Sequence, residues 1–163
     1  PAADAYVRSS MPNANLGTAT ALIVHWGNTS SNQRWAYLKF DLTSVPTISD
    51  AKLRVFGAIS GTTSTVVQTA VYPVADTSWP ETGINWNNKP SVGAGALSVV
   101  TIVTNSTTPR WYELDVTAYL QAEKAAGRNV VTLAPKYILQ GTKELELSSK
   151  EATANRPALF VVP

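Results

Sequence analysis

Residues 34–42 read Arg-Trp-Ala-Tyr-Leu-Lys-Phe-Asp-Leu, and this stretch decides the fold class. Successive side chains of a β-strand point to opposite faces of its sheet, so a period of two separates a buried face from an outward one. One face of this stretch is apolar and is predicted to be buried: Ala36, Leu38, Phe40 and Leu42. The other face is predicted to point outward: Trp35, Tyr37 and Lys39. The stretch is therefore predicted to be a strand of an antiparallel sheet.

The same alternation recurs in short bursts that Gly, Pro, Asn, Ser and Thr separate. It predicts nine further strands: 4–8, 20–26, 51–58, 66–74, 97–104, 110–116, 130–137, 144–150 and 158–162. A helix is predicted over 116–126, with Asp115 or Thr117 as its N-cap and Gly127 just after its end. Many short strands with turns between them favour an all-β antiparallel sandwich (jelly roll) with one short helix over an α/β fold.

Composition narrows the class of protein. The 163 residues are 44% hydrophobic and 15% charged, and no Pro- or Gly-rich linker divides them, so residues 1–163 are predicted to form a single domain. Cysteine is absent, which excludes disulfides and thiolate metal sites. The thirteen Lys and Arg residues are dispersed, without the basic run of nucleic-acid-binding proteins, and no apolar run reaches the ~18 residues of a membrane span. We expect a monomer with neither nucleic acid nor membrane as partner.

Basic and aromatic residues on the outward strand faces form a candidate binding surface. Aromatic rings can stack on sugar rings, while ammonium and guanidinium groups pair with carboxylates or sulfates. Lys52 and Arg54 alternate outward along 51–58, and we expect their row to meet that of Trp35, Tyr37 and Lys39. The pattern adds three further candidates: His25, Arg34 and Lys136. The alternative is that these are ordinary solvated strand charges, with His25 hydrogen-bonded to a neighbour.

The irregular stretch 75–96 contains Trp79 and Trp86. The two indoles could form a sugar platform at one end of the sandwich. The alternative interpretation is that Trp86 anchors a long loop to the core while Glu81 and Asn87 satisfy its backbone groups.

The carboxylates show no spacing that implies the facing pair of a glycosidase, so no catalytic residue is assigned and the chain is predicted not to be an enzyme. No cofactor is required for binding. Loops of sandwich domains can, however, supply the oxygen ligands of a structural calcium ion. Asp4, Asn15 and Asp115 are the candidate ligands, and Asn13 is a further one.

Seven short motifs, in order along nearly the whole chain, resemble carbohydrate-binding module family 96, also called the DNRLRE domain, of secreted bacterial and archaeal multidomain proteins. They are 4–8 (DAYVR), 13–17 (NANLG), 36–42 (AYLKFDL), 51–54 (AKLR), 79–90 (WPETGINWNNKP), 111–117 (WYELDVT), and 149–151 (SKE) followed by 155–157 (NRP). Two positions depart from the family pattern: Leu16 replaces an aromatic residue, and Lys150 replaces Arg, which loses the bidentate guanidinium fork.

The resemblance implies a β-sandwich jelly roll without catalysis, and for characterised members binding to alginate through basic residues. Carried over by position, Lys39, Arg54 and Lys150 are the implied charge contacts. The predicted function is therefore that of an extracellular, non-catalytic module that binds an acidic, uronate-containing polysaccharide and targets an attached catalytic or other domain. Two alternatives stay open: a structural or adhesive cell-surface module, and a small polysaccharide lyase in which His25, Tyr37 and Arg54 would act.

Overall fold

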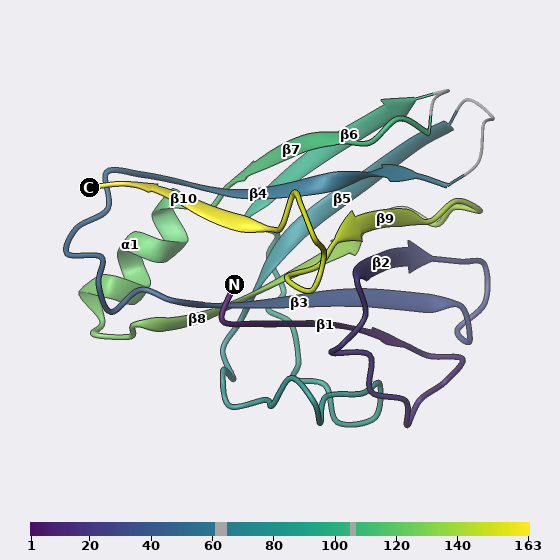
Figure 1. The fold of residues 1–163 in the computed structure, drawn as a ribbon, viewed down its shortest axis with the longest axis horizontal. Helices are drawn as coiled ribbons and strands as arrows, with labels where there is room; N and C mark the ends of the chain where they lie inside the picture. Colours follow the sequence, from purple (N-terminus) through teal and green to yellow (C-terminus); the bar gives the residue numbers. More distant parts are fainter. Residues whose placement is uncertain (61–64, 105–106) are drawn as a thin grey trace.

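The computed structural model describes residues 1–60, 65–104 and 107–163, which form ten strands and one helix (Figure 1). The strands are β1 (Ala3–Arg8), β2 (Ala21–Trp26), β3 (Gln33–Asp41), β4 (Asp50–Ile59), β5 (Thr65–Val74), β6 (Ser98–Thr104), β7 (Arg110–Asp115), β8 (Val130–Tyr137), β9 (Leu145–Ser148) and β10 (Ala158–Val162). The helix is α1 (Thr117–Ala125). Every predicted strand and the predicted helix are confirmed, and no end shifts by more than two residues.

The strands pair antiparallel and curl into two layers, as Figure 1 shows. The first layer runs β1-β3-β8-β5-β6, and in it Leu38 of β3 pairs with Asp4 of β1 and Leu133 of β8. In the second layer β4 pairs with β7 along one edge and with β10 and β9 along the other. Strand β2 joins the layers, because it pairs with both β9 and β3. The all-β sandwich class is confirmed.

The main hydrophobic core lies between the two layers. The predicted inner face of β3 is confirmed, since Ala36, Leu38, Phe40 and Leu42 are all buried. From the second layer, Leu53 and Val55 of β4 belong to the same core, among others. Each buried Leu, Val or Phe side chain stabilises the fold by roughly 1.5–3 kcal/mol.

Helix α1 lies at one end of the sandwich and buries Leu120. Its N-cap is Val116, so the prediction of Asp115 or Thr117 as the N-cap is wrong. The Asp115 carboxylate instead accepts a hydrogen bond from the Thr117 backbone N–H at 2.9 Å. Gly127 follows the helix with φ of 74°, the left-handed conformation that glycine adopts without strain, as predicted. No helix in the described ranges is both long enough and apolar enough to cross a bilayer.

A second, smaller hydrophobic cluster lies on the outer face of the first layer. Residues 75–97, here called the β5–β6 loop, fold back over β1, β3 and β8, and Trp79 and Ile84 become buried there. Beneath them Tyr37 is fully buried, and its hydroxyl donates to the Pro90 carbonyl at 2.9 Å. The expectation of an open outward row on β3 is thus wrong for Tyr37, because the β5–β6 loop covers it.

Candidate functional site

Trp35 lies in the outward row on β3 and stays partly exposed, as Lys39 does. Its indole ring contacts Trp86 of the β5–β6 loop edge-to-face, with 5.2 Å between centroids and 62° between planes. Edge-to-face pairs of this kind stabilise by about 0.5–1.5 kcal/mol beyond simple burial. The pair therefore sets two indoles rigidly beside one another at the surface.

Two ammonium groups flank this pair. Lys136 Nζ lies 4.0 Å from the Trp35 ring centroid and 5.1 Å from that of Tyr72. Lys89 Nζ lies 3.8 Å from the centroid of Trp86 and 5.1 Å from that of Trp35. Within the described residues neither ammonium forms an ion pair with a carboxylate. We call Trp35, Trp86, Lys89 and Lys136 the Trp35 surface.

The electrostatics of the Trp35 surface favour an anionic ligand. Burial lowers the pKa of both lysines below the ordinary value, and for Lys89 the charge of Lys136 lowers the pKa further. Removing two like charges partly from water is unfavourable until an anion joins them. Beside Trp35 lies a hollow of about 290 Å³ lined by Lys89, Pro90, Ser91 and Val92, which leaves room for part of a sugar chain.

Three predicted ligand-binding residues, Lys39, Arg34 and His25, have partners within the protein itself. Lys39 Nζ donates to the Trp79 carbonyl at 2.6 Å and lies over the Trp79 ring, so it supports the β5–β6 loop. Arg34 pairs with Glu144. His25 is only 3% exposed, and its Nε2 lies 2.9 Å from the Gly141 carbonyl, which agrees with the alternative of a hydrogen-bonded sheet residue. These side chains therefore stabilise the fold and are not free to contact a ligand from solvent.

Arg54 and Lys52 lie on the second layer, away from the Trp35 surface. Arg54 Nε is 3.0 Å from the Glu113 carboxylate, and its guanidinium lies 4.9 Å from the Trp111 ring centroid. Lys52 faces Asp115 across the β4–β7 ladder. The expectation that the rows of β3 and β4 meet is wrong, because these strands belong to different layers and do not pair. The three residues that a lyase centre would need are likewise not brought together: His25, Tyr37 and Arg54.

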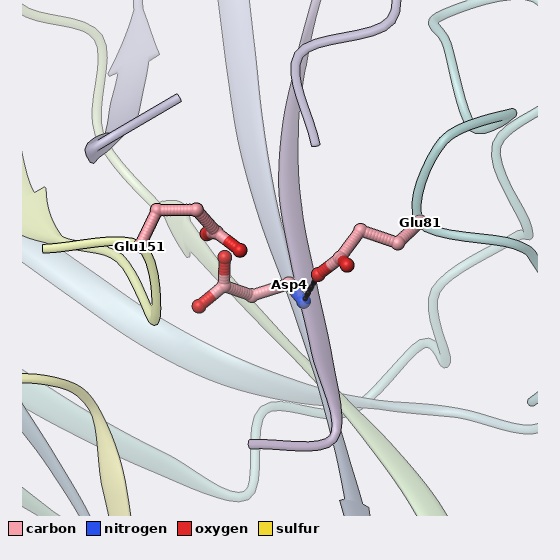
Figure 2. Close-up of side chains that lie close together, drawn as sticks. All are labelled: Asp4, Glu81 and Glu151. Atoms are coloured by element: carbon pink, nitrogen blue, oxygen red, sulfur yellow. Dashed lines mark hydrogen bonds between the residues drawn. The ribbon is translucent and has the colours of Figure 1, made fainter. Parts of the chain in front are cut away.

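Lys150 lies in a separate cluster of charges with Asp4, Glu81 and Glu151, whose three carboxylates Figure 2 shows. Lys150 Nζ is 3.0 Å from Glu81 Oε2 and also pairs with Glu151. The Lys150 backbone N–H donates to Asp4 Oδ2 at 2.7 Å. Burial, followed by the neighbouring Glu151 and Glu81 charges, raises the pKa of Asp4 to about 7 despite that hydrogen bond.

Of the four predicted metal ligands, Asp4 belongs to this cluster of carboxylates, whereas Asn13 Oδ1 accepts a hydrogen bond from the Asn87 side-chain amide at 2.8 Å. Asn15 lies beside the cluster, but its amide nitrogen donates to the carbonyls of Glu81 at 2.7 Å and Ile84 at 2.8 Å. Asn15 therefore positions the backbone of the β5–β6 loop. Asp115 lies before α1 and bonds Thr117, so it does not belong to the same site.

Sequence reasoning missed Lys89 as a contact and treated Trp86 separately from Trp35. Trp86 does pack against the outer cluster, as the loop-anchor interpretation requires. Lys89 donates to the Trp86 carbonyl at 2.8 Å, so a local turn places the ammonium over the indole. A single lysine in a loop shows no alternation pattern that would mark it as part of a surface. The residue that makes Lys89 part of this surface, Trp35, lies on strand β3.

A β-sandwich that holds partly exposed indoles beside ammonium groups without a carboxylate partner among the described residues has the features of a carbohydrate-binding domain. Comparison with known families agrees: the model of carbohydrate-binding module family 96 matches residues 1–163, so the chain belongs to this family. A relative among characterised proteins is a gellan lyase from Bacillus sp, which is 30% identical over 164 residues. The match covers 99% of this chain but 6% of the lyase, so the chain corresponds to a small part of that protein.

Proposed function

We propose that this chain is a non-catalytic module that binds an acidic, uronate-containing polysaccharide at the Trp35 surface. The observation that carries the proposal is the pair of ammonium groups, Lys89 and Lys136, that share one half-exposed indole and lack a carboxylate partner among the described residues. Other lysine and arginine candidates, such as Arg34, Arg54 and Lys150, already have carboxylate partners.

In the proposed mode of binding, sugar rings pack against Trp35 and Trp86 while Lys89 and Lys136 pair with uronate carboxylates. Exposed ion pairs contribute about 0.2–1 kcal/mol each and are screened by salt. Affinity for a single module is therefore modest and salt-sensitive, and attachment to another domain would raise it by increasing the effective concentration.

The relative gives the proposal a biological setting. Its name describes a lyase that acts on gellan, an acidic polysaccharide, and the matched part is a small fraction of its length. By analogy, we propose that this chain is a single monomeric module of a secreted protein, and that it holds an attached catalytic domain near an acidic glycan. Alginate, the ligand that the family resemblance implies, is one such glycan. The binding step itself uses side chains alone and no cofactor, and any bound calcium would have a structural role.

The test is affinity electrophoresis and calorimetry against alginate, pectate, gellan, hyaluronan and a neutral glucan. We expect binding to acidic glycans, and we expect 0.5 M NaCl to abolish most of it. The double variant Lys89→Gln with Lys136→Gln should weaken binding about 2- to 30-fold, the equivalent of two exposed ion pairs.

The matched control is Lys52→Gln, which removes a lysine from the second layer and should leave affinity unchanged. Equal binding to the neutral glucan, or unaltered affinity in the double variant, would contradict the proposal. A folded protein that binds none of these glycans would instead favour a structural or adhesive module. A rise in absorbance at 235 nm on incubation with the uronates would indicate a lyase.

A further inference from the structure

The cluster of Asp4, Glu81 and Glu151 has the spacing of a cation site. One carboxylate oxygen from each residue lies within 4.8 Å of the other two. Calcium–oxygen distances are about 2.3–2.6 Å, so oxygens on opposite sides of one calcium ion are themselves about 4.6–5.2 Å apart. All three oxygens can therefore reach a common centre with small adjustments of their side chains.

Two acceptor atoms of this cluster lack a donor. Asp4 is 1% exposed, and its Oδ1 has no hydrogen-bond partner, while its Oδ2 accepts from the Lys150 backbone. Glu151 Oε2 is likewise buried without a partner. In Figure 2 the Asp4 and Glu151 carboxylates point toward each other. Two facing buried carboxylate oxygens without a donor are costly, and either a proton shared between them or a bound cation removes that cost.

The charges of the four side chains do not balance. When all three carboxylates are ionised they contribute −3 and Lys150 contributes +1, which leaves a formal charge of −2 in a partly buried place. One divalent cation brings the sum to zero without displacing Lys150, whose ammonium already bonds the Glu81 oxygen that faces it at 3.0 Å. Lys150 alone is not sufficient as the counter-ion.

We propose that Asp4, Glu81 and Glu151 bind a calcium ion that joins three segments distant in sequence. The ligands come from edge strand β1, from the β5–β6 loop and from the turn after β9. Carboxylate oxygens are hard ligands, and calcium accepts irregular sets of six to eight of them with water, whereas magnesium requires a near-ideal octahedron.

The Glu81 backbone is already held in place for this role. Asn15 donates to its carbonyl, and Gly17 makes the close approach possible, because a Cβ at residue 17 would lie 2.1 Å from that carbonyl oxygen. The Glu81 side chain accepts from the Asp4 backbone N–H at 2.7 Å. Calcium would thus join elements that are prepositioned, and it would stabilise the loop that carries Trp86 and Lys89.

The experiment is a titration of the chelator-treated protein with calcium chloride, followed by calorimetry and by thermal unfolding, without any glycan. We expect saturable binding at one site, and a rise in Tm of about 5–10 °C at a calcium concentration 100 times the dissociation constant. Magnesium should give a smaller rise. The absence of glycan keeps the result independent of the proposed polysaccharide binding.

Glu81→Gln and Glu151→Gln should each abolish most of the calcium response, while Glu113→Gln, a change in a carboxylate on β7, should retain it. Circular dichroism establishes that each variant is folded. A wild-type protein without calcium-dependent heat or Tm shift up to 10 mM overturns the proposal. So does a response that appears only in Lys150→Met, because the lysine would then be the cation that fills the site.

Discussion

Lys89 and Lys136 show how the surroundings of a residue change its chemistry. Both ammonium groups lie over indole rings and are partly withdrawn from water, and this burial is the main cause of their lowered pKa values. An indole face attracts a cation through its quadrupole, which partly offsets the desolvation. Pairing with a carboxylate is therefore more favourable for these two ammonium groups than for a fully exposed lysine.

The lowered pKa values predict a pH dependence of glycan binding. The charged ammonium is the binding form, so affinity for uronate oligosaccharides should be constant near pH 7 and should fall as pH rises through the lowered lysine pKa values, below the ordinary 10.5. Calorimetry between pH 7 and 10 measures this. Lys136→Arg is the matched control, because a guanidinium stays charged throughout this range, and it should reduce the loss. Affinity that is equal at pH 7 and pH 10 in the wild type would contradict the prediction.

At the scale of elements, the β5–β6 loop is part of the folded core rather than a surface appendage. Trp79 is 4% exposed, packs 6.1 Å from the Tyr37 ring centroid, and donates from its indole nitrogen to Thr132 at 3.1 Å. Tyr37 and Lys39 in turn bond loop carbonyls. The outward row of β3 thus anchors the loop, and the loop presents Trp86 and Lys89.

Trp79→Ala should therefore lower the free energy of unfolding by about 3–5 kcal/mol, the usual range for removing a buried tryptophan. It should also weaken glycan binding, since the loop would lose its main anchor. Urea unfolding measures the stability. Trp111→Ala on β7 is the control, because Trp111 is 37% exposed and lies on the other layer. A smaller loss in Trp79→Ala than in Trp111→Ala would show that the loop is not anchored in this way.

At the scale of the whole molecule, strands β4 and β9 of the second layer approach each other closely where they pair. Gly57 pairs with Leu147, and a Cβ at Gly57 would lie 2.0 Å from the Glu146 carbonyl oxygen. A backbone oxygen in a ladder cannot move aside without breaking its strand pairing. Glycine is required here for its missing side chain, because its φ is not in the left-handed region.

Gly57→Ala should consequently destabilise the protein by about 1–3 kcal/mol, or more if β9 separates from β4. Gly95→Ala is the matched control, since a Cβ there meets nothing within 4 Å, and its effect should stay within about 0.5 kcal/mol. Denaturant midpoints of the two variants decide the point. Equal midpoints would mean that the β4–β9 contact relaxes freely.

Much of the fold could be read from local patterns. Alternation in residues 34–42 and its recurrence along the chain predict all ten strands, the buried face of β3 and the sandwich class, because strand periodicity is imposed residue by residue. Trp35 and Lys136 could also be predicted as surface candidates from the same alternation.

The site itself depended on tertiary structure. Alternation shows that a side chain leaves the core, but not whether a distant segment covers it, so Tyr37 was expected at the surface and is buried under the β5–β6 loop. Alternation also does not show to which layer a strand belongs. Arg54 and Trp35 are separated because their strands lie in different layers. The meeting of Lys89 with Trp35, and of Asp4 with Glu81 and Glu151, joins residues 50 to 150 positions apart. Such contacts are decided by how distant strands and loops pack, which no local pattern records.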